Sequence, residues 1–164
     1  MRERTARRSL ITWTLSVALF ATAFGLLFML LKAAEAKDAR TAAWLSAVRP
    51  ALPAGAHVKD VSWYRGSLSL LAVALDRPEP EIIWADASGR IVGRFQGPAA
   101  SEDEIAQKAA ADVPGARVVR ITPGWEADQA MYEVVLRLPH GGVGYRYYGM
   151  ADGELRLSVI FPPR

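Results

Sequence analysis

The longest apolar stretch of the chain lies near its N-terminal end. Residues 9–31 have the sequence SLITWTLSVALFATAFGLLFMLL, with no charged side chain. A helix of this length covers about 34 Å, and the hydrocarbon core of a bilayer is about 30 Å thick. The alternative is a buried core helix, but so long an uncharged run rarely sits inside a small domain. The pattern predicts a membrane-spanning helix over residues 9–32.

Charges on either side of this run predict its direction. Arginines stand at positions 2, 4, 7 and 8, whereas residues 32–38 mix basic and acidic side chains. Because positive residues stay cytoplasmic, we expect residues 1–8 inside and the remainder of the chain outside. Ala34-Glu35-Ala36 has the small-residue pattern of a signal-peptidase site. The apolar run is longer than a signal core of about 7–15 residues, which favours an uncleaved anchor.

After the span, apolar spacing indicates two copies of one small unit. The first copy begins with helical spacing at Trp44, Leu45 and Val48. Its segment 55–61 (GAHVKDV) is matched sixty positions later by 115–121 (GARVVRI). No helix breaker separates the apolar run from Trp44, so the membrane helix is predicted to continue into the helix of the first unit.

The second copy has its own helix start, and strands follow both helices. Ser101 and Glu104 form the pattern of a capping box, and Pro114-Gly115 marks the end of that helix. Apolar spacing then changes from 3.6 to 2, which indicates strands with one buried face. The predicted strands are 58–64, 68–75, 81–85 and 90–95 in the first copy, with later runs at 131–138, 145–148 and 155–161.

The predicted fold is α+β. A transmembrane helix precedes two tandem units, residues 37–97 and 98–164, each with one helix and a four-stranded antiparallel sheet. A unit of about 60 residues is only marginally stable alone. Strand 68–75 is apolar on both faces, so one face can take a helix and the other needs a second cover. We expect the two units to pack together, because the connector 96–100 is too short to hold them far apart.

Charge and composition exclude several function classes. The first 32 residues carry a net charge of +4, and the remainder holds 15 Lys and Arg against 16 Asp and Glu, a net charge of −1, which together give the formal net charge of +3. Binding to nucleic acid needs clustered cations, and no such cluster follows residue 32. The absence of cysteine removes disulfides, thiol nucleophiles and thiolate metal sites.

No pattern in the sequence indicates catalysis. The serines stand in strand, turn or cap positions without a G-x-S-x-G or S-x-x-K motif. His57 and His140 have neither metal-ligand spacing nor a neighbouring acid arrangement. The glycines at 141, 142 and 144 suggest a phosphate loop, but no helix N-terminus follows them. We therefore predict no enzyme activity, no cofactor and no metal ion.

A candidate partner-binding surface combines arginine with aromatic side chains, a composition typical of protein contacts. It is expected on the face of the second sheet opposite Tyr132, Val134 and Leu136, and a solvated sheet face is an equal alternative. A tryptophan after Pro123-Gly124 is either an exposed anchor or packed on the rim of its unit. The candidate contact residues are Trp125, Arg137, Arg146, Tyr148 and Arg156.

Several short motifs carry a family resemblance. They are Gly124-Trp125-Glu126, Met131–Val135, Tyr145–Tyr148, Trp63–Gly66 and Ile82–Trp84. In order and spacing they resemble the TseB-like (YpmB-type) cell-wall elongation regulator family over residues 10–160, although Tyr132 stands where that family usually has Trp. The resemblance implies cystatin-like or PepSY-like units behind one span in a bacterial cell membrane. It also implies contact with a penicillin-binding protein during peptidoglycan synthesis.

The function expected from these patterns is that of a membrane-anchored extracytoplasmic adaptor or regulator acting by protein contact. The alternative is a PepSY-like protease inhibitor or folding modulator whose edge strand or sheet occupies a peptidase cleft. A third possibility is a small-molecule or lipid binder that uses the concave face of a sheet.

Overall fold

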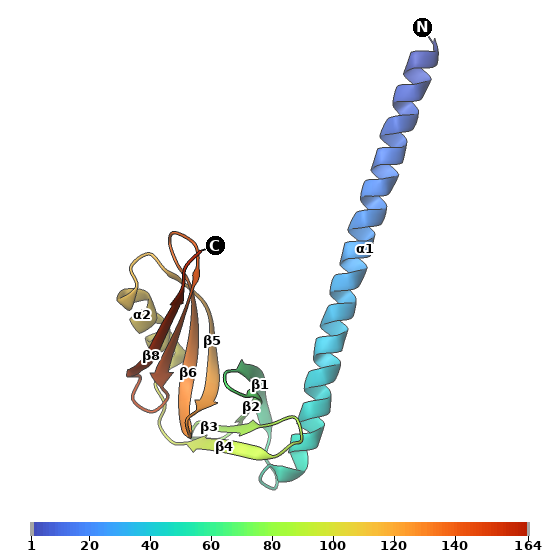
Figure 1. The fold of residues 1–164 in the computed structure, drawn as a ribbon. Coiled ribbons are helices and arrows are strands. Elements are labelled where there is room, and N and C mark those ends of the chain that lie inside the picture. The colour runs from blue at the N-terminus through green and yellow to red at the C-terminus, as the bar shows by residue number, and fades with distance from the viewer. Residues whose placement is uncertain (1, 164) are drawn as a thin grey trace. The chain divides into compact units, whose positions relative to one another are not determined.

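The computed structural model describes the backbone of residues 2–163 and the side chains of residues 22–163. Two helices, one short 3-10 helix and two four-stranded sheets make up the described chain (Figure 1). In chain order they are α1 (Arg2–Val48), η1 (Arg49–Ala51), β1 (Val58–Arg65), β2 (Ser69–Leu75), β3 (Glu81–Ala85), β4 (Ile91–Gln96), α2 (Glu102–Asp112), β5 (Arg117–Glu126), β6 (Gln129–Arg137), β7 (Val143–Gly149) and β8 (Leu155–Phe161).

The α1 helix confirms the predicted continuity, since one helix runs from Arg2 to Val48. Residues 9–21 of the predicted span lie outside the part of the chain whose side chains are described. In the remaining part, no helix is both long and apolar enough to cross a bilayer.

The chain divides into two compact parts, residues 1–43 and residues 44–164. The second part, called the body below, contains the last turn of α1 and all eight strands.

The two sheets of the body have the same topology, which confirms the predicted repeat. Each is an antiparallel meander, β1-β2-β3-β4 and β5-β6-β7-β8. Their irregularities also correspond: register shifts occur at Val58/Asp60 and, sixty positions later, at Val118/Arg120. Another pair of shifts lies between the third and fourth strands of each sheet, at Trp84/Ala85 and Tyr147/Tyr148. A bulge turns all later side chains of a strand to the opposite face. Because the bulges match, corresponding positions of the two sheets lie on corresponding faces.

One face of the first sheet is covered by the end of α1. Val48 is fully buried there, and the rings of Trp44 and Trp63 lie 4.5 Å apart. The strands contribute a separate apolar cluster, which consists of Leu71, Val73, Leu75, Ile83 and Ala85. The last turn of α1 therefore serves as the helix of the first unit.

One face of the second sheet is covered by α2. The predicted capping box is present: Ser101 Oγ accepts a hydrogen bond from the Glu104 amide at 3.2 Å, and Glu104 Oε2 accepts one from the Ser101 amide at 2.8 Å. These bonds satisfy amides that a helix start leaves free. Ile105 and Ala109 are fully buried beneath α2 against the strands. Figure 1 shows α2 lying along this sheet.

The two sheets share one core, which confirms the expectation that the units pack together. The second face of β1–β4 lies against the end of the β5–β6 hairpin, with the first sheet across the lower end of the second (Figure 1). Trp84 is fully buried in this contact; its Nε1 donates to the Pro123 carbonyl at 3.2 Å, and its ring centroid lies 5.4 Å from that of Trp125. Trp125 lies over Gly93, where a Cβ would stand only 2.2 Å from the indole.

A second contact of this inter-sheet core is polar. Tyr64 is buried and packs on Gly124, where a Cβ would lie 2.5 Å from the phenol ring. The Tyr64 hydroxyl donates to Glu126 Oε2 at 2.9 Å, and the Ser67 amide donates to the same oxygen at 3.1 Å. Burial opposes ionisation of Glu126, but these hydrogen bonds outweigh it and lower the pKa of the carboxyl below its ordinary value.

The lowered pKa of Glu126 predicts an acid-sensitive contribution to stability. A carboxyl with a depressed folded-state pKa stabilises the fold above its unfolded pKa, and that contribution disappears as pH falls through the folded value. We expect Glu126→Gln to reduce the free energy of unfolding at neutral pH and to flatten its dependence on pH below about 4.5. Urea unfolding at a series of pH values measures both effects. Parallel curves for the variant and the wild type would contradict this role of Glu126.

Candidate partner-binding surface

The structure places Tyr148 and Arg146 on the α2 side of the second sheet, so the prediction of their face was wrong. In the register, Tyr132 pairs with Tyr148 and Val134 with Arg146, which puts all four on one face. Tyr148 is buried. The Asp112 carboxylate at the end of α2 accepts a hydrogen bond from the Tyr148 hydroxyl at 3.1 Å and one from Arg146 Nη1 at 2.7 Å. These two residues hold the helix on the sheet.

The other predicted contact residues are dispersed. Trp125 is half-buried between the two sheets, so it packs inside the body instead of forming an exposed anchor. Arg156 is exposed and pairs with Asp152 in the β7–β8 connection. Arg137 is exposed on the face opposite α2, as predicted. The five candidates therefore do not form one surface.

The sheet face opposite α2 carries a different aromatic and arginine surface, which the sequence patterns missed. The helices of the body lie on other faces: the end of α1 packs on the first sheet, and α2 packs on the opposite side of the second sheet. We call this surface the open face; it consists of Val135, Val143, Tyr145, Tyr147, Leu157, Val159 and Phe161. The rings of Tyr145 and Phe161 meet edge to face with centroids 5.8 Å apart. Leu157 is 54% and Phe161 56% exposed.

Three arginines border the open face on its β5 side. The pairing of the strands gives one row across the sheet, Arg117–Arg137–Val143–Phe161, and a neighbouring row, Arg120–Val135–Tyr145–Val159. We call Arg117, Arg120 and Arg137 the arginine rim. Arg117 and Arg137 stand directly opposite each other on adjacent strands. Like charges in that position repel.

One member of the rim is neutralised by a buried acid. Glu133 is 2% exposed and accepts a hydrogen bond from Arg120 Nη2 at 2.8 Å and one from the Tyr147 hydroxyl at 3.2 Å. Burial and the nearby carboxylate raise the pKa of Tyr147 to about 12, so its phenol stays protonated as a donor. Within residues 22–163, no acidic side chain pairs with Arg117 or Arg137.

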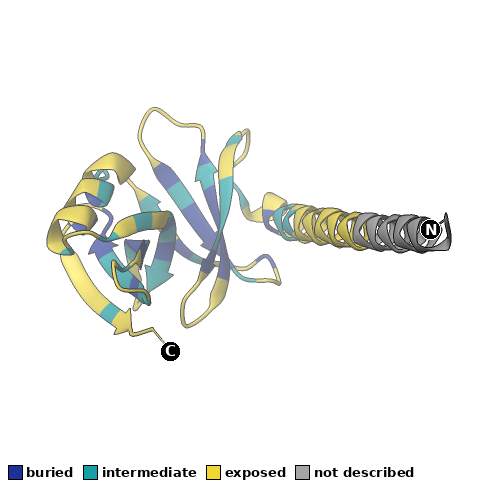
Figure 2. Cartoon of the chain, turned by 90° about the horizontal axis from the view of Figure 1, so that it is seen from above, coloured by how far each residue is buried: buried dark blue, intermediate teal, exposed yellow. Residues whose placement is uncertain are grey.

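The open face continues to an exposed sheet edge. β8 is the last strand of its sheet, and Figure 2 shows it exposed over most of its length. Four of its side chains, Leu155, Leu157, Ile160 and Phe161, are 43–56% exposed. An apolar edge strand with unpaired backbone groups is a template for pairing with another chain. This combination favours a surface for protein contact.

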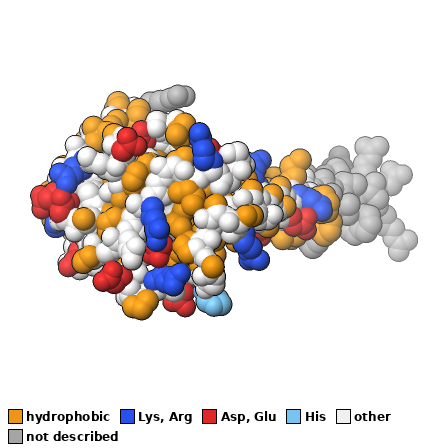
Figure 3. Space-filling view, turned by 90° about the horizontal axis from the view of Figure 1, so that it is seen from below, with side chains coloured by type: hydrophobic (Ala, Val, Ile, Leu, Met, Phe, Trp, Pro, Cys, Tyr) orange, Lys and Arg blue, Asp and Glu red, His pale blue; other side chains and the backbone are white. Residues whose placement is uncertain are grey.

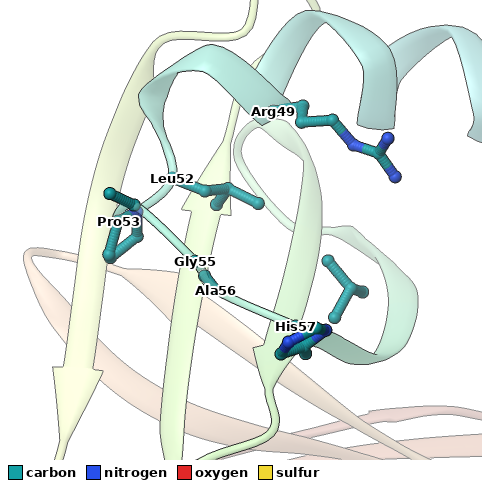
Figure 4. Close-up of a pocket in the computed structure, with 8 residues that line it drawn as sticks. Arg49, Leu52, Pro53, Gly55, Ala56 and His57 are labelled. Carbon is teal, nitrogen blue, oxygen red and sulfur yellow. The ribbon is translucent and has the colours of Figure 1, made fainter.

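Other parts of the body offer less to a partner. A hollow of about 440 Å³ lies beside η1 and has Arg49 and His57 as its ionisable side chains (Figure 4). The Arg49 side chain extends away from the loop and His57 lies at its other end, so the two do not converge (Figure 4). On the side seen in Figure 3, side chains of both charges are scattered among hydrophobic ones over the residues drawn in colour.

Comparison with known proteins supports the architecture. No family model matches the sequence, and no curated protein sequence matches it. Among solved structures, the chain is similar to the YpmB protein from Bacillus subtilis, with a TM-score of 0.57 and 18% sequence identity; the similarity covers 71% of this chain and 96% of that chain. The fold is therefore YpmB-like: α+β, with two four-stranded antiparallel sheets and one long helix.

Proposed function

We propose that this protein is a membrane-anchored extracytoplasmic adaptor of cell-wall synthesis that acts by binding another protein through the open face. The observation that carries the proposal is the difference between the two sheets. Both faces of β1–β4 are covered within the body, whereas the open face of the second sheet is only partly covered, with Leu157 54% and Phe161 56% exposed beside an arginine rim. Such a composition is typical of protein-binding surfaces.

The proposals of a membrane anchor and of a partner class are argued from the sequence. The uncharged run over residues 9–31 and the arginines before it favour a single span with the body outside. The motif resemblance favours a penicillin-binding protein as the partner, and the YpmB-like fold is compatible with it.

A photo-crosslinking residue placed at Leu157 in intact cells tests this function. Position 157 lies on the open face, and Gln107, exposed on α2, is the matched control position. We expect a membrane-fraction adduct with a penicillin-binding protein at 157 and none at 107. The same adduct at both positions, or no protein adduct at 157, would contradict the proposal.

Strand addition by β8 is a second candidate function, that of an inhibitor or folding modulator of a peptidase. It is favoured by the exposed apolar edge described above, because an extended edge can enter a peptidase cleft. The same crosslinking experiment separates the two: a peptidase in the adduct supports this alternative.

A further inference from the structure

The covered face of the first sheet is a structural precedent for how a partner covers the open face. Through the matching bulges, Trp84 and Ile82 of the first sheet occupy the positions of Tyr147 and Tyr145 in the second, and Phe95 the position of Val159. In the first sheet this face is covered by the tip of a β-hairpin, β5–β6. On the equivalent face of the second sheet, Leu157 and Phe161 are 54% and 56% exposed within the described residues.

The covering hairpin meets its sheet with an aromatic side chain and a carboxylate. The ring of Trp125 packs on that of Trp84, and Glu126 Oε2 accepts a hydrogen bond from the Tyr64 hydroxyl at 2.9 Å. Tyr64 corresponds to Gly124 of the second sheet, at the other end of β5 from Arg117. The hairpin is therefore a precedent for an aromatic side chain packed on the sheet, and the charge of a partner has to be argued from the arginine rim itself.

The opposed pair Arg117 and Arg137 gives an independent indication of an acidic partner. The two positions face each other across β5 and β6, and neither arginine forms an ion pair with an acidic side chain within the described residues. This arrangement costs stability in the isolated chain, and an anionic group placed between the two guanidinium groups would reverse the sign of that interaction.

We infer that the open face binds an acidic β-hairpin of a partner protein, with its apolar side chains on β7 and β8 and its carboxylates at Arg117 and Arg137. This inference rests on the proposed function that the protein acts by contact. The apolar rows determine where the hairpin lies, and the arginine rim selects for its charge.

Three synthetic β-hairpin peptides of one sequence, with Glu, Gln or Lys beside a central Trp, test the charge selection on the purified full chain. We expect the Glu peptide to bind at least about tenfold more tightly than the Lys peptide, with an advantage that shrinks as salt rises. The double variant Arg117→Glu/Arg137→Glu keeps like charges opposite each other and should invert the order of the peptides. The exposed pair Arg49→Glu/Lys59→Glu has the same change in charge off the open face and should leave the order intact.

A single variant separates binding from folding. Arg117→Glu creates an ion pair with Arg137 across the strands, so we expect a higher thermal midpoint together with weaker binding of the Glu peptide. Equal affinities for the three peptides, an order unchanged in the double variant, or no saturable binding of the Glu peptide up to about 1 mM would overturn the inference. Self-association through this face would overturn it as well. An adduct at Leu157 in cells together with any of these results would leave the adaptor function standing without its charge selection.

Discussion

Replacing Trp84 with alanine is expected to lower the free energy of unfolding by about 3–5 kcal/mol, the usual range for emptying a buried tryptophan site. The side chain is fully buried, and it touches both sheets. Its loss removes the ring contact with Trp125 and leaves the Pro123 carbonyl without its donor. Because this contact joins the two units, the change should weaken the body as a whole.

Urea unfolding followed by circular dichroism measures this effect without relying on fluorescence, since the chain has five tryptophans. Leu68→Ala is a suitable control, because Leu68 is 57% exposed and should change stability by less than about 0.5 kcal/mol. Trp84→Phe keeps an aromatic ring but not the donor, and should fall between the two. If Trp84→Ala unfolds at the same urea concentration as the wild type, this contact does not hold the sheets together.

Local features of the fold were predictable because each rests on neighbouring residues. The capping box at Ser101 and the period-two runs gave the start of α2 and the positions of most strands. Strand 68–75 is apolar on both faces, which correctly predicted that both faces of β2 are buried, one in each apolar cluster. These signals depend on spacing of a few residues, and the pattern contains that information.

The position of the candidate surface could not be predicted from the same patterns. Periodicity states which residues of one strand share a face, but it does not give the register between strands. Periodicity alone therefore groups Tyr148 with Arg137, whereas pairing with Tyr132 places Tyr148 beneath α2. The open face depends on the same register, so Tyr145, Tyr147 and the opposed arginines became visible only in the structure.

The resembling motifs have a structural explanation that the sequence did not reveal. Tyr64, Gly66 and Trp84 come from the first unit, and Gly124, Trp125 and Glu126 from the second; all of them meet in the inter-sheet core. The spacing of these residues in the sequence thus records how the two units join, whereas the motif Tyr145–Tyr148 contributes Tyr145 and Tyr147 to the open face. One available signal was Gly93, a glycine inside a strand, which often marks the close approach of another group.

Gly93 therefore provides the most specific test of how the units join. Gly93→Ala places a Cβ 2.2 Å from Trp125 Cδ2, and the ring of Trp84 packs against the same indole with centroids 5.4 Å apart. We expect a loss of about 1–3 kcal/mol in the free energy of unfolding, the range for overpacking a core. Gly144→Ala is a matched control, since its Cβ would meet nothing closer than 3.6 Å.

A double-mutant cycle assigns the cause. If the indole is what excludes a side chain at position 93, Gly93→Ala should cost little in a chain that already carries Trp125→Ala, because the smaller residue leaves space for the new methyl group. The coupling free energy between the two positions should then approach the cost of the single change. Additive losses would instead mean that Gly93 is required by the backbone of β4, and the two sheets would not be joined through this contact.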